Sequence, residues 1–170
     1  MTIHSEDPFA TPEEQRSPVR RLRGRAAAAV TLWTAGEGTG RAGLTVSSAL
    51  VADGQPGRLL GLVDDESDFW AAARPAGRFA YALLGPDDKQ LADRFAGLLP
   101  APGGLFLDPV WTQTAYGPVL ASASAWAGCR IDDARGFGWG LLVEATIEEI
   151  TLGPAAPPLL YHRGRYRELP

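Results

Sequence analysis

Three hydroxyl side chains stand together in the run Leu44-Thr45-Val46-Ser47-Ser48, within an otherwise apolar and β-branched stretch. Neighbouring side chains of a strand point to opposite faces, so Ser47 and Ser48 cannot both face solvent. A hydroxyl that faces inward needs a hydrogen-bond partner, which a polar ligand could supply. The pattern also fits a half-exposed strand whose Ser and Thr face water, and the residues alone leave both interpretations open.

A second candidate is the acidic run Val63–Trp70 (VDDESDFW), which holds four carboxylates in eight residues. A metal site would need further ligands, and no histidine or other acidic cluster is identified that completes a coordination shell. A catalytic carboxylate pair would need a buried setting. Ser67 or Asp68 is a typical N-cap, and acidic side chains favour the positive end of a helix dipole. We therefore predict a helix start with no metal site, and expect Phe69 or Trp70 to turn inward.

The sequence gives little support to two familiar motifs, that of a serine hydrolase and that of a dinucleotide-binding site. The only histidines are His4 and His162, and no G-x-S-x-G motif accompanies them, so no nucleophile or other catalytic residue is assigned. Gly38–Gly43 (GTGRAG) matches G-x-G-x-x-G, but β-branched residues follow it where a dinucleotide site requires a helix. We predict a hairpin turn at this motif.

The C-terminal run His162–Tyr166 (HRGRY) concentrates hydrogen-bond donors around one titratable imidazole. The apolar residues Leu159, Leu160 and Tyr161 come directly before it, so we expect this segment to be docked on the domain. A docked HRGRY segment could face an anionic cofactor or substrate.

The chain as a whole sets limits on these sites. Its 170 residues, 45% of them hydrophobic and 21% charged, predict one soluble domain over residues 18–170 after a flexible N-terminal arm over residues 1–17. The net charge of −4 argues against nonspecific nucleic-acid binding, and no apolar run is long enough to span a membrane. Cys129 is the only cysteine, which excludes an intramolecular disulfide and favours a cytoplasmic setting.

Twenty glycines and 14 prolines spread along the chain indicate many short strands. We expect strands near residues 27–35, 42–51, 58–63, 78–85, 118–131 and 139–152, a turn at 132–138, and irregular structure at 101–117. Expected helices cover residues 18–25, 67–76 and 87–99. This order predicts a mainly β fold, a six- to seven-stranded antiparallel split β-barrel with helices covering its open ends.

Three segments together resemble a known family. AVTLWTA…GRAGLTVSSALV, RFAYALLGPDDKQLADRFAG and PLLYHRGRY are similar, in order and spacing, to the flavin reductase-like family of FMN-binding split barrels, over roughly residues 20–169. The resemblance implies an NAD(P)H-dependent flavin oxidoreductase that passes a hydride to FMN or FAD. It also implies a homodimer and a partner monooxygenase that receives the reduced flavin.

The resemblance also implies roles for particular residues. Thr45, Val46, Ser47 and Ser48 would run along the flavin edge, and Ser67 and Arg94 are candidates for binding the cofactor. His162, Arg163 and Tyr166 would lie near the flavin or the incoming nicotinamide.

The sequence departs from the family pattern at the flavin phosphate. The family commonly carries Arg or Lys, Ser and Thr at the positions that here read Asp65, Glu66, Ser67 and Phe69. Like charges a few ångströms apart repel by about 1 kcal/mol even in water. Either Arg41, Arg94 or an arginine of a second subunit holds the phosphate, or flavin binds weakly. Gly136–Gly140 also lacks the histidine that many members carry near this point.

These departures leave two alternatives open beside the reductase. The chain could be a non-catalytic split-barrel dimer with weak or altered cofactor binding. A third interpretation keeps the pocket and fills it with another cofactor, such as a deazaflavin or haem.

Overall fold

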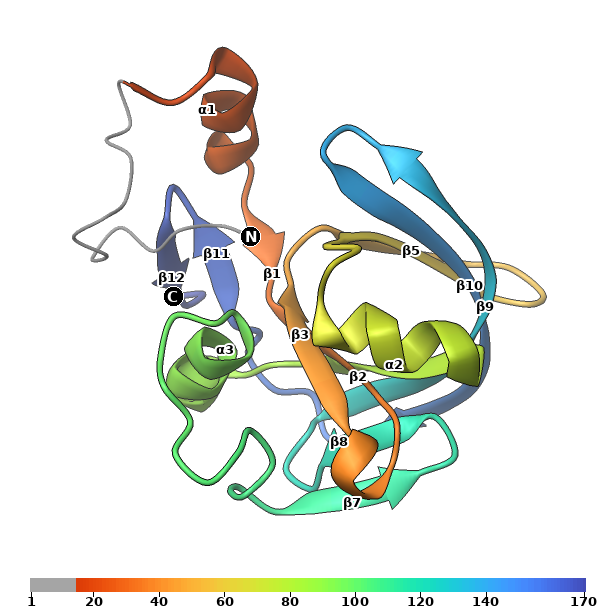
Figure 1. Cartoon of the computed structure of the whole chain (residues 1–170). Helices are drawn as coiled ribbons and strands as arrows, with labels where there is room; N and C mark the ends of the chain where they lie inside the picture. Colours follow the sequence, from red (N-terminus) through yellow and green to blue (C-terminus); the bar gives the residue numbers. More distant parts are fainter. Residues whose placement is uncertain (1–14) are drawn as a thin grey trace.

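The computed structural model describes residues 15–170, so the greater part of the predicted arm, residues 1–14, lies outside the described residues. A seven-stranded antiparallel sheet with the order β3-β2-β6-β9-β10-β5-β4 forms the body of the fold (Figure 1). Its strands are β2 (Thr31–Ala35), β3 (Ala42–Val46), β4 (Ala49–Ala52), β5 (Arg58–Val63), β6 (Arg78–Leu83), β9 (Ala125–Phe137) and β10 (Gly140–Leu152). The predicted antiparallel, mainly β architecture is confirmed.

Smaller elements complete this fold. Three strands, β1 (Ala28–Ala29), β11 (Leu160–His162) and β12 (Arg165–Arg167), form one small sheet, and β7 (Trp111–Thr114) and β8 (Gly117–Leu120) form a hairpin. The helices are α1 (Pro18–Arg25), α2 (Asp68–Ala76) and α3 (Lys89–Phe95), and the 3-10 turns are η2 (Gly38–Gly40) and η3 (Pro86–Asp88). The three predicted helices are confirmed, α3 being shorter than expected.

The sheet closes on itself at Ser47 and Ser48. We expected a single strand over residues 42–51, which is wrong, because the chain bends at these two serines. The segment before the bend, β3, pairs with β2, and the segment after it, β4, pairs with β5 at the other end of the strand order. The carbonyl of Ser48 accepts a hydrogen bond of 2.9 Å from the Leu62 N–H. One straight strand could not pair with both partners, so this corner joins the two edges of the sheet.

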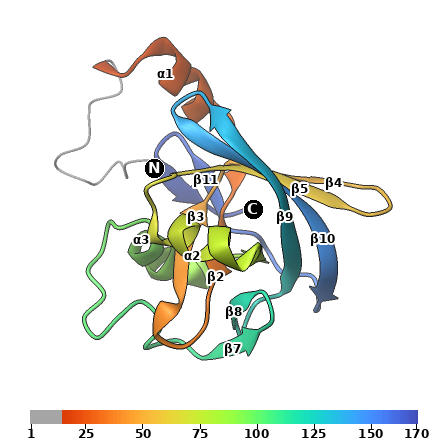
Figure 2. The same cartoon turned by 45° about the vertical axis from the view of Figure 1, so that its right-hand side comes forward.

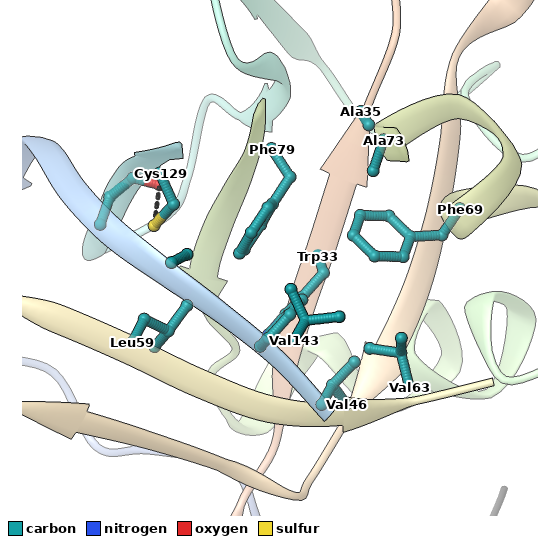
Figure 3. Close-up of a cluster of buried hydrophobic side chains, with 12 residues drawn as sticks. Trp33, Ala35, Val46, Leu59, Val63, Phe69, Ala73, Phe79, Cys129 and Val143 are labelled. Atoms are coloured by element: carbon teal, nitrogen blue, oxygen red, sulfur yellow. Dashed lines mark hydrogen bonds between the residues drawn. The ribbon is translucent and has the colours of Figure 1, made fainter. Parts of the chain in front are cut away.

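The larger core cluster lies inside the curled sheet and is capped by α2. Trp33 of β2 stacks on Phe79 of β6 with ring centroids 4.6 Å apart, and Phe69 of α2 meets Trp33 edge-on at 6.0 Å (Figure 3). Gly61 of β5 leaves room for the indole, because a Cβ there would lie 2.6 Å from Cη2 of Trp33. Of the two aromatic residues of α2 that were expected to turn inward, Phe69 is the fully buried one, and Trp70 is only partly buried.

A second core cluster joins α3 to the C-terminal strands. Leu91 and Phe95 of α3 are buried with Leu32, Leu84 and Leu159, and Tyr161 and Tyr166 pack against this group. The predicted docking of the C-terminal segment is thereby confirmed.

Three expectations in the second half of the chain are wrong. The supposedly irregular residues 101–117 contain β7 and the start of β8, and the single strand expected at 118–131 is divided between β8 and β9. The turn expected at 132–138 is instead part of β9, which runs to Phe137. The charged residues that suggested a turn instead find partners across the β9–β10 pair. Arg135 lies 2.7 Å from Glu144, and Thr146 donates to Asp132 at 2.6 Å.

Candidate functional site

The corner at Ser47 and Ser48 is held from two sides. The Thr45 hydroxyl donates to the carbonyl of Ala92 in α3 at 2.6 Å, and the Val46 carbonyl accepts from the Thr31 hydroxyl at 2.6 Å. Ser47 and Ser48 are half-buried, and their hydroxyls make no hydrogen bond to the residues that the structure describes. The corner therefore has two serine hydroxyls whose bonding capacity is unused by the described residues.

Helix α3 connects this corner to the C-terminal hairpin. Asp93, the residue after Ala92, accepts a hydrogen bond of 2.7 Å from the Tyr166 hydroxyl. Burial and the adjacent Asp93 carboxylate both raise the pKa of Tyr166, so the phenol keeps its proton and acts as the donor. The next residue, Arg94, forms an ion pair of 3.1 Å with Asp108. Sequence reasoning missed Asp93, although it stands beside Arg94 in the ADRFAG motif.

The HRGRY segment forms the turn between β11 and β12. Arg163 and Gly164 have φ angles of 53° and 82°, as a type I′ hairpin turn requires. The Arg163 N–H donates to the Gly24 carbonyl at 2.8 Å, which satisfies a carbonyl in the last turn of α1. His162 is half-buried at the end of β11, directly before this turn. The turn thus ties α1 to the C-terminal strands.

The acidic run is the start of α2, as predicted. Ser67 is the N-cap, since its hydroxyl accepts from the Trp70 N–H at 3.2 Å and donates to the Asp64 carbonyl at 2.6 Å. All four carboxylates of the run are exposed, and none forms an ion pair with a basic side chain of residues 15–170. Helix capping, rather than acid–base chemistry, accounts for these residues.

The match with known proteins agrees with this arrangement. The family model for the flavin reductase like domain matches residues 23–170, which include the corner, α2, α3 and the HRGRY turn. The chain belongs to the flavin reductase like domain family.

Individual members of the family are similar over most of their length. An FMN reductase (NADH) RutF 2 of Methylorubrum extorquens is 34% identical over 168 residues, covering 98% of this chain and 95% of that protein. The reductase component of a 4-nitrophenol 4-monooxygenase/4-nitrocatechol 2-monooxygenase of Rhodococcus opacus is 31% identical, with coverage of 89% and 80%. The crystal structure of a flavin reductase domain protein of Arthrobacter sp. FB24 superimposes with a TM-score of 0.78 at 27% identity, with coverage of 89% and 93%.

The flavin that this family name implies fits one part of the site and not another. The hydroxyls of Ser47 and Ser48 are unengaged, and hydroxyl groups can hydrogen-bond the carbonyl and nitrogen atoms of a flavin ring. The loop at Asp64–Asp68 does not fit a phosphate, because its carboxylates are unpaired and its one hydroxyl caps α2. Of the alternative phosphate ligands, Arg94 is paired with Asp108, and Arg41 donates to the Gly38 carbonyl at 3.0 Å while lying over Phe106.

The predicted site residues fall into two groups in this flavin reductase-like fold. Helix α3 brings together Thr45, Arg94 and Tyr166, whereas Ser67 belongs to the separate start of α2. Neither of two surface hollows contains a predicted site residue: one of about 510 Å³ lies between the β4–β5 turn and β10, and one of about 220 Å³ lies along α1.

Residues 15–170 contain neither a cluster of metal-binding side chains nor a helix that could span a membrane. No three His, Cys, Asp or Glu side chains gather there in a way that would hold a metal ion. None of the helices in that range has the length and apolar character that crossing a membrane demands.

Proposed function

We propose that this protein is a flavin reductase that transfers a hydride from NADH or NADPH to FMN or FAD. The observation that carries the proposal is the family match over residues 23–170, within which the corner keeps two unengaged hydroxyls at Ser47 and Ser48. The similar Methylorubrum protein is named an FMN reductase (NADH), which supports this choice of substrates. A bound flavin would supply the hydride-accepting chemistry, while the protein supplies position and electrostatics.

The residues have distinct roles in this proposal. Ser47 and Ser48 hydrogen-bond the flavin edge, and Thr45 and Val46 hold the corner in place through Ala92 and Thr31. His162, Arg163 and Tyr166 lie on the side of the nicotinamide. Ser67 and Arg94 already have partners in the protein: Ser67 donates to the Asp64 carbonyl, and Arg94 is paired with Asp108. Each of them contacts the cofactor only by sharing its partner with the cofactor or by giving that partner up.

We further propose that the reduced flavin passes to a partner monooxygenase in the cytoplasm. The Rhodococcus relative is the reductase component of such an enzyme, which supports this partner class. Residues 18–170 act as the reductase domain. A mixture of this protein with a flavin-dependent monooxygenase should couple NADH oxidation to formation of the monooxygenase product. If all of the oxidised NADH is instead recovered as hydrogen peroxide, which catalase removes, the pairing is contradicted.

We propose a homodimer that uses the outer face of β4 and β10. Val51 of β4 and Ile150 of β10 are 51% and 60% exposed and both line the larger hollow, and Leu152 of β10 is 76% exposed. Apolar side chains gathered in this way mark an interaction surface. Light scattering of the purified protein should give twice the chain mass, and Leu152→Glu should shift it toward the monomer. A monomeric native protein would refute the dimer.

The exposed acidic run at Asp64–Asp68 favours one alternative, a non-catalytic member that binds flavin weakly. Titration with FMN, followed by flavin fluorescence, and NADH oxidation after addition of FMN or FAD separate the two functions. Saturable FMN quenching with NADH oxidation supports the reductase. A protein that neither quenches flavin fluorescence nor oxidises NADH or NADPH with either flavin is not a flavin reductase.

A further inference from the structure

The basic side chains of this protein are gathered at one end. Residues 16–25 and 160–168 hold eight of the chain's 16 basic side chains but only one of its 20 acidic ones, Glu168. These two segments therefore carry a formal charge of +7. Residues 26–159 hold the other eight basic side chains with 15 acidic ones, a formal charge of −7. An anion that approaches the folded domain is steered toward the basic end.

The two basic segments form one surface. Helix α1 lies above the β11–β12 hairpin in both views (Figures 1 and 2), joined to it by the hydrogen bond from Arg163 to Gly24. Burial raises the pKa of Tyr161 in β11, while the nearby guanidinium groups of Arg16, Arg23 and Arg20 oppose that rise. We call this surface, formed by α1 and the β11–β12 hairpin, the arginine face.

Part of the arginine face has no neutralising carboxylate within the part of the chain that the structure describes. Arg20, Arg21, Arg23 and Arg25 form no ion pair with an acidic side chain of residues 15–170, in contrast to Arg94, which is paired with Asp108. Arg21 and Arg25 are one helical turn apart and line the hollow of about 220 Å³ together with Pro18 and Leu22. The hollow is thus lined by two arginines and by the apolar residues Pro18 and Leu22.

We propose that the arginine face binds the phosphate groups of a nucleotide substrate, with Arg21 and Arg25 as the principal ligands. Guanidinium groups match phosphate oxygens with paired N–H donors, which makes arginine well suited to diphosphates. The identification of the ligand as a nucleotide rests on the proposed reductase function, since the nicotinamide dinucleotides and FAD carry a diphosphate and FMN carries a monophosphate. If kinetics assign the arginine face to the flavin, the conflict at Asp64–Asp68 disappears, because the flavin phosphate is then held by positive charge instead.

The direct test is calorimetric binding of inorganic pyrophosphate and of ADP to the full chain at fixed low ionic strength. The variant Arg21→Ala/Arg25→Ala should bind both about tenfold more weakly, because two charge-assisted contacts are lost. Arg74→Ala/Arg78→Ala is the matched control, because it also removes two exposed arginines, one in the last turn of α2 and one at the start of β6. The control should bind both probes as the native protein does.

Steady-state kinetics then identify the source of the phosphate. A rise in KM for NADH with unchanged KM for FMN assigns the arginine face to the nicotinamide dinucleotide, and the reverse pattern assigns it to the flavin. If the native protein binds pyrophosphate through these arginines but never oxidises NADH, the proposed reductase function fails while the phosphate site stands.

Three results would overturn the phosphate site. The native protein could fail to bind pyrophosphate or ADP at millimolar concentration, or the double variant could bind them as tightly as the native protein. The third result is binding to vesicles of anionic phospholipid that is lost in the double variant without any pyrophosphate binding, which would make α1 a membrane-surface helix instead.

Discussion

The hydroxyl of Tyr166 donates a hydrogen bond to the carboxylate of Asp93, with Oη and Oδ1 2.7 Å apart. The residue before Asp93 in α3, Ala92, accepts the hydrogen bond from Thr45. Two adjacent residues of one helix therefore hold the C-terminal hairpin and the Ser47–Ser48 corner. Disturbing either contact should loosen both parts of the proposed flavin site.

Replacing Tyr166 by Phe should lower the free energy of unfolding by about 1 to 2 kcal/mol, because the half-buried Asp93 loses its donor. Urea denaturation followed by tryptophan fluorescence measures the change. Tyr116→Phe is the matched control, since its hydroxyl lies 3.5 Å from the exposed Glu148 and should contribute much less. Equal losses in the two variants would contradict the importance of the Tyr166–Asp93 contact.

Stability should also fall at alkaline pH. The pKa values of Tyr161 and Tyr166 are raised above the ordinary 10.0, chiefly by burial. The unfolded chain releases these protons near that ordinary value while the folded protein retains them, so their contribution is complete below pH 10 and declines as the pH rises above it. Urea midpoints measured across this range should drop, and drop less steeply in Tyr166→Phe. A variant and native protein with the same alkaline slope would exclude Tyr166 as a cause.

Gly61→Ala should be strongly destabilising. The new Cβ would lie 2.6 Å from the indole of Trp33 and 3.0 Å from the Ser48 carbonyl, so both the core and the corner must shift. Overpacking of this kind costs about 1 to 3 kcal/mol. Gly136→Ala in β9 is the control, because a Cβ there meets nothing within 4 Å. Thermal unfolding of the two variants should differ clearly, and identical melting temperatures would show that the Trp33 pocket is not tightly packed.

Local signals predicted the helices well, and long-range pairing explains the errors in the strands. The cap Ser67 is recognisable from a few neighbouring residues, so α2 begins where expected. The bend at Ser47–Ser48 has no local signal, because it exists only through pairing of β3 with β2 and of β4 with β5.

The same distinction applies to the candidate site. The family motifs indicated that LTVSS, ADRFAG and HRGRY belong together, but not how they meet. Tyr166 and Asp93 are 73 positions apart in the chain, and no periodicity connects them. For the arginines of α1 the sequence predicted only that they lie on a helix. It did not predict that they lie close to Arg163, because that closeness depends on the pairing of β1 with β11.

Cys129 should react with thiol reagents only after unfolding. It is fully buried in β9, and burial raises the pKa of its thiol to about 12, so the reactive thiolate is scarce at neutral pH. Because no other cysteine exists in the chain, the whole labelling signal reports this residue. A disulfide reagent should label the native protein slowly, and fully in denaturing urea. Rapid stoichiometric labelling of the native protein would mean that β9 opens locally.

The acidic run before α2 gives the last prediction, that Asp65→Arg with Glu66→Ser tightens FMN binding if the flavin phosphate approaches this loop. The exposed carboxylates at Asp64–Asp68 have no basic partner within residues 15–170, so removing two of them and adding a cation converts repulsion into attraction. The control is Asp87→Arg with Glu37→Ser, two exposed acids on other elements whose replacement changes the net charge equally. Flavin fluorescence titration measures both affinities. Tighter binding in the loop variant alone would place the phosphate beside α2. Unchanged affinity would exclude the loop and is the result expected if the arginine face holds the phosphate.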